Sequence, residues 1–283
     1  HDQGRRQRQM CIRDSLLTFL FGIWFSQNNI SEIADFAILG GLNTFETYSL
    51  KSALAVIIAV TAAEIFSTGY WQRTFSAMNE TTIKKASIYS GFGVFITILL
   101  LGIAGAVGAG KGLEIPTLSF INQLSLNSMT VLVLISLATL LVTSSVDTLE
   151  NAISSTISID LIKKGSKEAN NITLLVIILA LFASTRVTNI FTVFLVADLL
   201  ATSLVFPAFY RIKKTSKDIL LVLPFVGSLV SVFVYRYLFI NLEENPGGLF
   251  VPTDLYGLAD LNTFAIALVS SVIITFVADR FTK

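Results

Sequence analysis

Five polar side chains recur at helical spacing within the segment LLVTSSVDTLENAISSTISIDLIKK. They are Ser144, Asp147, Thr148, Asn151 and Ser155, at positions i, i+3, i+4, i+7 and i+11, so a helix would carry them on one stripe. Oxygen-bearing side chains aligned at membrane depth can replace the water shell of a hard cation. Such a stripe is also typical of helices held together in membranes by Ser and Thr hydrogen bonds. These residues alone leave a cation site and helix packing as equal alternatives.

A second, shorter stripe consists of Thr61, Glu64 and Thr68, at i, i+3 and i+7 in the segment VTAAEIFSTGYW. We expect this stripe to face the protein interior. There it can contact a polar substrate or pair with the first stripe.

Four ionisable residues lie within or beside apolar runs: Glu64, Asp147, Glu150 and Asp198. Such residues cost a few kcal/mol inside a membrane and therefore often have a function. The alternative for each is a hydrogen bond between helices or a place at a helix end near water. We expect that structural role for Glu150, whereas Glu64, Asp147 and Asp198 remain open between the two.

Long uncharged runs separate the charges of this chain, which is 53% hydrophobic and only 14% charged. Soluble domains contain about 25% charged residues. A helix needs about 20 apolar residues to cross a bilayer, and backbone groups in lipid must pair within each span. The composition therefore predicts an all-α polytopic membrane protein with about seven full transmembrane helices and one partial helix. The partial helix covers 16–26 and the full spans cover 52–71, 86–109, 128–147, 172–185, 189–210, 218–240 and 262–278.

The segments between these spans differ in character. Segments 26–50 and 114–127 are long and partly apolar, so each can hold a short surface helix. Segment 241–257, NLEENPGGLFVPTDLYG, is rich in turn-forming residues, and we expect it to be solvated.

The basic residues between the spans are distributed unevenly, and basic loops favour the cytoplasmic side. Twelve lie on one side of the predicted membrane and four on the other. We therefore expect an integral protein of the plasma membrane with a cytoplasmic C-terminus. The twelve are Arg73, Lys84, Lys85, Lys163, Lys164, Lys167, Arg211, Lys213, Lys214, Lys217, Arg280 and Lys283, and the four are Lys51, Lys111, Arg186 and Arg236.

Residues 1–15 do not resemble a signal peptide or a domain. Residues 5–14 back-translate into a string that resembles the transposase adaptor used in sequencing libraries, so we expect 1–15 to be non-native. The transporter domain would then be 16–283 and would lack its N-terminal part. The only histidine, His1, and the only cysteine, Cys11, fall within 1–15. This excludes disulfides, thiol catalysis, zinc sites and histidine proton relays from 16–283.

Three motifs on separate predicted spans resemble the sodium:solute symporter family, in the order in which that family has them. SSVDTLENAISSTISIDLIKK is similar to the family signature, in which a hydroxyl pair precedes a Ser/Thr-rich helix. YWQRTFSAMNETTIKKAS resembles a helix-end motif of the family, and FPAFYRIKK resembles its Pro-containing helix ending. The motifs are spread over the chain between residues 70 and 214.

This resemblance implies the second half of a LeuT-type bundle of two inverted five-helix repeats. It implies a sodium site formed by the side chains of Ser144 and Ser145 and the backbone carbonyl of Leu141. The solute would lie near the midplane, partly against the Thr61–Thr68 face. Val60 and Ala63 stand where sugar-transporting members have polar residues, which argues against a sugar. The implied substrate is a small polar organic solute, either an amino acid such as proline or a urea-like molecule.

The resemblance therefore implies sodium-coupled symport by alternating access, with Na⁺ as the coupling ion and no other cofactor. A proton-coupled symporter using Glu64 or Asp198 and a transporter-like sensor module remain as alternatives. The absence of a Gly-x-Ser-x-Gly motif, and of His and Cys after residue 15, argues against an enzyme. We expect partners to be the solute, Na⁺ and lipid, with no nucleic acid. The sequence does not specify an oligomeric state.

Overall fold

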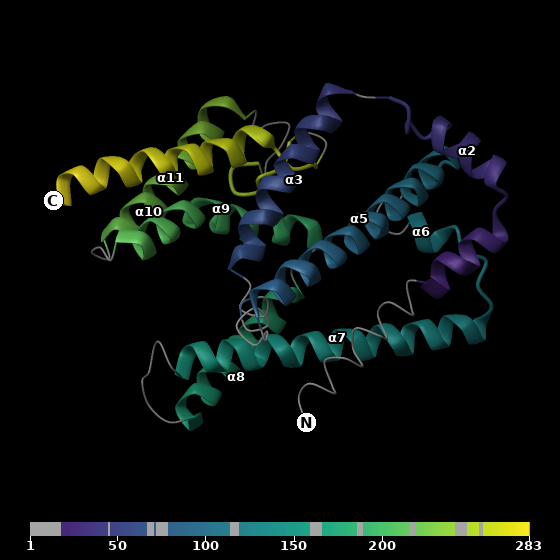
Figure 1. Cartoon of the computed structure of the whole chain (residues 1–283), viewed down its shortest axis with the longest axis horizontal. Coiled ribbons are helices and arrows are strands. Elements are labelled where there is room, and N and C mark those ends of the chain that lie inside the picture. The colour runs from purple at the N-terminus through teal and green to yellow at the C-terminus, as the bar shows by residue number, and fades with distance from the viewer. Residues whose placement is uncertain are drawn as a thin grey trace. The chain divides into compact units, whose positions relative to one another are not determined.

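The computed structural model describes residues 18–44, 46–66, 71, 79–113, 119–158, 166–185, 189–214, 219–240, 248–254 and 257–282. Regular structure in these ranges is helical, with one isolated antiparallel bridge between Thr253 and Ala259. Figure 1 labels the helices and colours them from purple near the N-terminus to yellow at the C-terminus. The prediction of an all-α protein is confirmed for the described residues.

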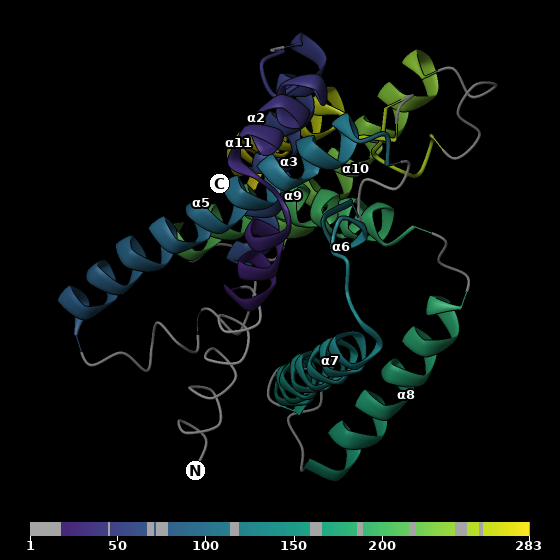
Figure 2. The same cartoon turned by 90° about the vertical axis from the view of Figure 1, so that its right-hand side faces the viewer.

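Six helices are long and apolar enough to cross a membrane, which is consistent with a polytopic membrane protein. Five of the predicted full spans, all except 52–71 and 172–185, fall within one of these helices apart from one-residue differences at their ends. Helices α5 and α7 extend well beyond the predicted spans, and Figure 2 shows α5 as one unbroken ribbon. The six are α3 (Thr47–Ile65), α5 (Glu80–Gly110), α7 (Ser128–Thr156), α9 (Ile190–Lys214), α10 (Ile219–Phe239) and α11 (Leu261–Thr282).

The predicted span 172–185 lies in α8 (Ser166–Ser184), and its apolar part, Asn171–Phe182, is shorter than a membrane span. The described residues thus contain six helices of membrane-spanning length, one fewer than the seven full spans predicted. Residues 18–27 are helical, as expected for the partial span. Short helices also occur in the two long connecting segments, α2 (Ile30–Leu39) and α6 (Ser119–Asn122), which confirms that expectation.

Helix α3 is shifted toward the N-terminus relative to its predicted span, 52–71. The helix starts at Thr47, before the predicted span. The prediction began later because hydropathy excludes polar residues that the first turn of a helix tolerates. It ends at Ile65, where the Phe66 amide donates to the Ala63 carbonyl at 3.0 Å. The Trp71 indole donates to the Ile65 carbonyl at 2.6 Å and so satisfies one carbonyl of the helix end. Glu64 is therefore next to the end of α3 and not in its middle.

The chain divides into two compact units, and the division falls inside α8 at Val176. Unit 1 comprises His1–Thr44 and Thr74–Val176, and unit 2 comprises Phe45–Arg73 and Ile177–Lys283.

In unit 1, α2 and α6 pack against the C-terminal part of α5. Backbones of α2 and α5 touch at Gly40 and Gly110. A Cβ atom at Gly40 would lie 1.9 Å from the Ala106 carbonyl oxygen, and one at Gly110 would lie 2.0 Å from that of Phe36. Only glycine fits at either position. The apolar residues buried around this contact are Phe21, Trp24, Ala37, Ala104, Val107 and Leu124.

Side-chain hydrogen bonds reinforce this packing in unit 1. Trp24 Nε1 donates to Gln123 Oε1 at 3.0 Å, and Gln123 Nε2 donates to the Ala104 carbonyl at 2.7 Å. Lys111 Nζ donates to Asn28 Oδ1 at 2.7 Å, close to the C-terminal end of α5, where a positive charge is favourable. These bonds link the helix of residues 18–27, α5 and the segment after α6.

Unit 2 is a bundle of α3, α9, α10 and α11, in which α10 and α11 run side by side (Figure 1). Ser228 Oγ on α10 lies 2.7 Å from the Ala267 carbonyl of α11 and 3.1 Å from Ser203 Oγ of α9. One buried hydroxyl thus joins three helices, as is common in membrane bundles. The apolar core of this unit consists of Ala55, Ala59, Leu195, Leu199, Val232, Ala259, Phe264 and Ala267.

Candidate functional site

Two of the three predicted sodium ligands are adjacent on α7. Ser145 Oγ donates to the Leu141 carbonyl oxygen at 3.0 Å, one helical turn earlier. Asn127 fixes the start of this helix by accepting a hydrogen bond from the Thr130 amide at 2.8 Å. Two oxygens at this separation can both contact one cation at about 2.4 Å, a distance typical of hard cations. The side chain of the third residue, Ser144, lies outside the described side chains, as do those of Thr148 and Asn151.

The other described polar residues of the α7 stripe do not gather around this pair. Asp147 and Glu150 are exposed, and Ser155 donates to the Ala152 carbonyl at 2.9 Å. Hydroxyls nearer the N-terminus of α7 also bond within the helix: Ser136 Oγ donates to the Leu132 carbonyl at 2.8 Å. None of the most apolar window of α7 is buried. The hydroxyls of Ser136, Ser145 and Ser155 thus bond to carbonyls of α7 itself.

The second predicted stripe lies on the exposed face of α3. Thr61 and Glu64 are exposed, whereas Ala55, Ala59 and Ala62 are buried. The expectation that this stripe faces the interior is therefore wrong within unit 2. Alanine is small enough to let α9 approach α3 closely, and this contact decides which face is buried. Thr68 lies outside the described residues.

Asp198 is buried, with 7% of its surface exposed, on the face of α9 that carries Leu195 and Leu199. Helix α9 packs against α3, and the negative charge of Glu64 acts on the Asp198 carboxyl. Thr202 Oγ1 donates to the backbone carbonyl of Asp198 at 2.8 Å and not to its side chain. Glu64 and Asp198 thus lie on two helices that pack together in unit 2, Glu64 on an exposed position of α3 and Asp198 on a buried position of α9.

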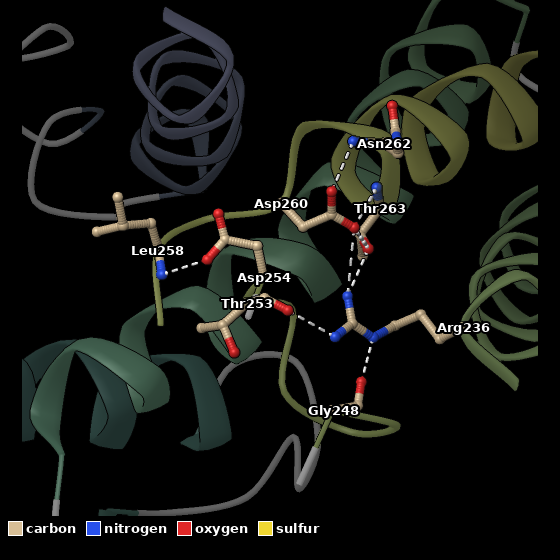
Figure 3. A network of polar contacts seen from close by, with 8 residues as sticks. All are labelled: Arg236, Gly248, Thr253, Asp254, Leu258, Asp260, Asn262 and Thr263. Atoms are coloured by element: carbon tan, nitrogen blue, oxygen red, sulfur yellow. Dashed lines mark hydrogen bonds and ion pairs between the residues drawn. The ribbon is translucent and has the colours of Figure 1, made fainter. Parts of the chain in front are cut away.

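Arg236, near the C-terminal end of α10, is the centre of a polar network that the sequence analysis did not identify. Its side chain is 1% exposed. Figure 3 shows the guanidinium among four acceptors from the segment between α10 and α11 and from the first turn of α11. Its NH1 lies 2.6 Å from Thr263 Oγ1 and 3.5 Å from Asp260 Oδ2, and its NH2 donates to the Thr253 carbonyl at 2.8 Å. Its Nε donates to the Gly248 carbonyl.

Asp260 connects this network to the start of α11. Its carboxylate accepts hydrogen bonds from the Asn262 amide and the Thr263 amide, both at 3.2 Å, and so caps the helix. In the turn before it, Asp254 Oδ1 accepts from the Leu258 amide at 2.9 Å. Gly257 adopts a φ of 76°, which glycine tolerates best.

The expectation that segment 241–257 is solvated is wrong for part of it: Gly248, Pro252 and Thr253 are buried, whereas Phe250 and Gly257 are exposed. Arg236 donates to the carbonyls of Gly248 and Thr253, and the Asp260 amide donates to the carbonyl of Pro252. The sequence does contain a signal for the capping role of Asp260. This residue directly precedes Leu-Asn-Thr and an apolar run, which is typical of the start of a helix. Arg236 gave no comparable signal, since a lone arginine at the end of an apolar run is usually a loop charge.

Among the described residues, no group of three or more His, Cys, Asp or Glu side chains is placed to hold a metal ion. Comparison with known proteins finds no matching family model, no matching curated protein and no matching solved structure.

Proposed function

We propose that the protein is a sodium-coupled secondary transporter of a small polar organic solute, either an amino acid or a urea-like molecule. The observation that carries the proposal is the contact between Ser145 Oγ and the Leu141 carbonyl on α7, at 3.0 Å. These two oxygens lie on a helix apolar enough to cross a membrane. They are also two of the three sodium ligands implied by the resemblance of segment 144–164 to the symporter signature.

Sodium would act by binding one conformation of the protein more tightly than another. A cation held between Ser144, Ser145 and the Leu141 carbonyl would stabilise the conformation open to the outside. Binding of the solute would then allow the helices to rearrange and expose the solute and the sodium ion to the inside. The excess of basic residues on one side supports a cytoplasmic C-terminus in the plasma membrane.

Direct binding of ²²Na⁺ to the purified protein tests this proposal. Ser145→Ala removes one ligand and is expected to weaken sodium binding by about 10-fold or more. Ser136→Ala is the matched control, because its hydroxyl makes the same bond to a carbonyl one turn earlier. Equal sodium binding by both variants and the wild type would reject the site.

Uptake into vesicles that contain the protein identifies the coupling ion. Labelled proline, other amino acids and urea are supplied with an inward sodium gradient or with an inward proton gradient. Uptake driven by sodium supports the proposal. Uptake driven by acid without sodium would instead support the proton-coupled alternative, for which the burial of Asp198 on α9 is the favouring observation.

A further inference from the structure

The C-terminal ends of α9 and α11 lie together in unit 2. The Tyr210 hydroxyl, in the last two turns of α9, donates to Asp279 Oδ2 on α11 at 2.8 Å. The ring centroids of Phe206 and Tyr210 lie 5.6 and 5.5 Å from that of Phe276 on α11. The two helices therefore finish side by side, and the residues around these contacts share one edge of the bundle.

This edge of the bundle is rich in basic residues. The apolar spans of α9 and α11 end at Ile212 and Phe281, so the last turns of both helices lie where a membrane span passes into the lipid headgroups. We call the basic residues of these two last turns the basic edge. They are Arg211, Lys213 and Lys214 on α9 and Arg280 on α11.

The negative charges of the two helix ends do not neutralise the basic edge. Asp279 contributes one negative charge, and each helix C-terminus contributes about half of one. Together they offset about two of the four positive charges, so a net positive charge of about two remains. The connecting residues 215–218 contain one lysine and one aspartate and leave this sum unchanged. Pairing with the helix dipoles therefore accounts for only part of the basic edge.

Exposed apolar side chains adjoin both arginines of the basic edge. Ile212, next to Arg211, is 77% exposed, and Phe281, next to Arg280, is 86% exposed. Arg280 is itself exposed, and Arg211 is half-buried. A phospholipid satisfies both kinds of side chain, because its phosphate meets the charges and its acyl chains cover the apolar groups. A soluble anion or an acidic peptide would leave the apolar groups in water.

The opposite end of the bundle offers no such combination around its arginine. Arg236, near the end of α10, is 1% exposed and lies 3.5 Å from Asp260 at the start of α11. Its positive charge is therefore used within the fold. The two ends of the α10–α11 pair thus differ in the positive charge that they present to a ligand.

We propose that the basic edge binds the headgroup of an anionic phospholipid, with Arg211 and Arg280 contacting its phosphate. The acyl chains lie in the bilayer beside Ile212 and Phe281. The sodium site proposed on α7 lies in unit 1 and shares no residue with the basic edge. Either proposal can therefore fail without the other.

Fluorescence quenching by brominated lipids tests the site in the full chain. Phe281→Trp places an indole beside Arg280, and the protein is reconstituted into phosphatidylcholine vesicles with increasing fractions of brominated phosphatidylglycerol. Quenching of this indole, relative to the chain without it, gives the affinity for phosphatidylglycerol relative to phosphatidylcholine. We expect a preference of about 10-fold or more, since one basic residue near an anionic membrane contributes about 5-fold.

Charge variants in the same reporter chain show which residues produce the preference. Arg211→Gln combined with Arg280→Gln is expected to remove most of it. Lys84→Gln combined with Lys85→Gln is the matched control, because it removes the same charge from exposed positions of α5 in unit 1. This control is expected to leave the preference unchanged. If Arg211→Gln impairs folding, Arg280→Gln alone is expected to lower the preference about 5-fold.

Three outcomes would overturn the proposal. The first is an equal affinity for both lipids in the reporter chain. The second is an equal loss of preference in the arginine and lysine variants, which would show an effect of total charge. The third is relief of the quenching by inorganic phosphate at constant ionic strength, which would make the basic edge a site for a soluble anion.

Discussion

The segment around Arg236 and helix α7 are both rich in polar groups, yet they use them in opposite ways. Arg236 bonds to groups 12 to 27 residues away, which joins the end of α10 to the start of α11. On α7, four hydroxyls bond within one turn of their own helix, those of Ser136, Thr139, Thr143 and Ser145. Polar groups of the first kind hold the fold together. Those of the second kind leave an oxygen lone pair free for a ligand at little cost to the fold.

The largest effect on stability is expected at Arg236. Arg236→Met would leave the buried carbonyls of Gly248 and Thr253 without their donor and Asp260 without its ion pair. Breaking a buried pair in this way lowers the free energy of unfolding by about 3–5 kcal/mol. Arg280→Met, at the exposed end of α11, is the control and is expected to stay within about 0.5 kcal/mol. Denaturant unfolding in micelles measures both, and equal losses would contradict a special role for Arg236.

The next largest effect is expected at the contact between α2 and α5. Gly110→Ala places a Cβ atom 2.0 Å from the Phe36 carbonyl oxygen, so the two helices must move apart. Such overpacking costs about 1–3 kcal/mol. Gly105→Ala, on the same helix, has no atom within 4 Å of the added Cβ. That control should be neutral or stabilised by up to about 1 kcal/mol through helix propensity. A thermal shift of the same sign in both variants would disprove the contact.

A smaller effect is expected from the hydroxyl that joins α9, α10 and α11. Ser228→Ala removes a bond between helices and should cost about 0.6–1.7 kcal/mol, the range for such bonds in membrane proteins. Ser270 donates within α11, to the Ile266 carbonyl at 2.6 Å. Ser270→Ala should therefore cost less than about 0.5 kcal/mol. The two denaturation midpoints can be compared directly, and a larger loss for Ser270→Ala would reverse the interpretation.

The smallest effect on stability is expected on α7 itself. Ser145→Ala removes only a bond within the helix from an exposed position, so unfolding in the absence of sodium should change by less than about 0.5 kcal/mol. In the presence of sodium, the wild type should gain stability that the variant lacks, because a ligand stabilises the state that binds it. Thermal denaturation with and without sodium measures this difference. A large loss for Ser145→Ala without sodium would indicate a packing role.

The sequence predicted the parts of the fold that depend on local composition. The start of α7 was identified to the residue because an uncharged apolar run directly follows Asn127, which caps the helix. The first turns of α5 were missed, because Glu80 and the residues after it are polar and continue the helix beyond its apolar part. Hydropathy marks the length that can lie in lipid and not the ends of the helix.

The candidate sites show the same limit. Asp198 was identified because a carboxylate in an apolar run is unusual; the residue is buried, and its role stays a prediction. The orientation of Thr61 and Glu64 was predicted wrongly, because the alanine face of α3 packs in unit 2. The buried network of Arg236 was not predicted, because its acceptors lie 12 to 27 residues later in the chain and local sequence patterns do not reveal such contacts. The roles of Ser144, Ser145 and Leu141 as sodium ligands stay predictions.

The network around Arg236 also has a consequence for how the protein is made. Arg236 is synthesised 24 residues before Asp260. At 5–20 residues per second, the arginine exists for roughly 1–5 s before the ribosome adds its carboxylate partner. During that interval Arg236 lacks its carboxylate partner, although the carbonyls of Gly248 and Thr253 are synthesised earlier. The complete network therefore forms only after the first turn of α11 has been made, a step that nascent-chain force measurements can time.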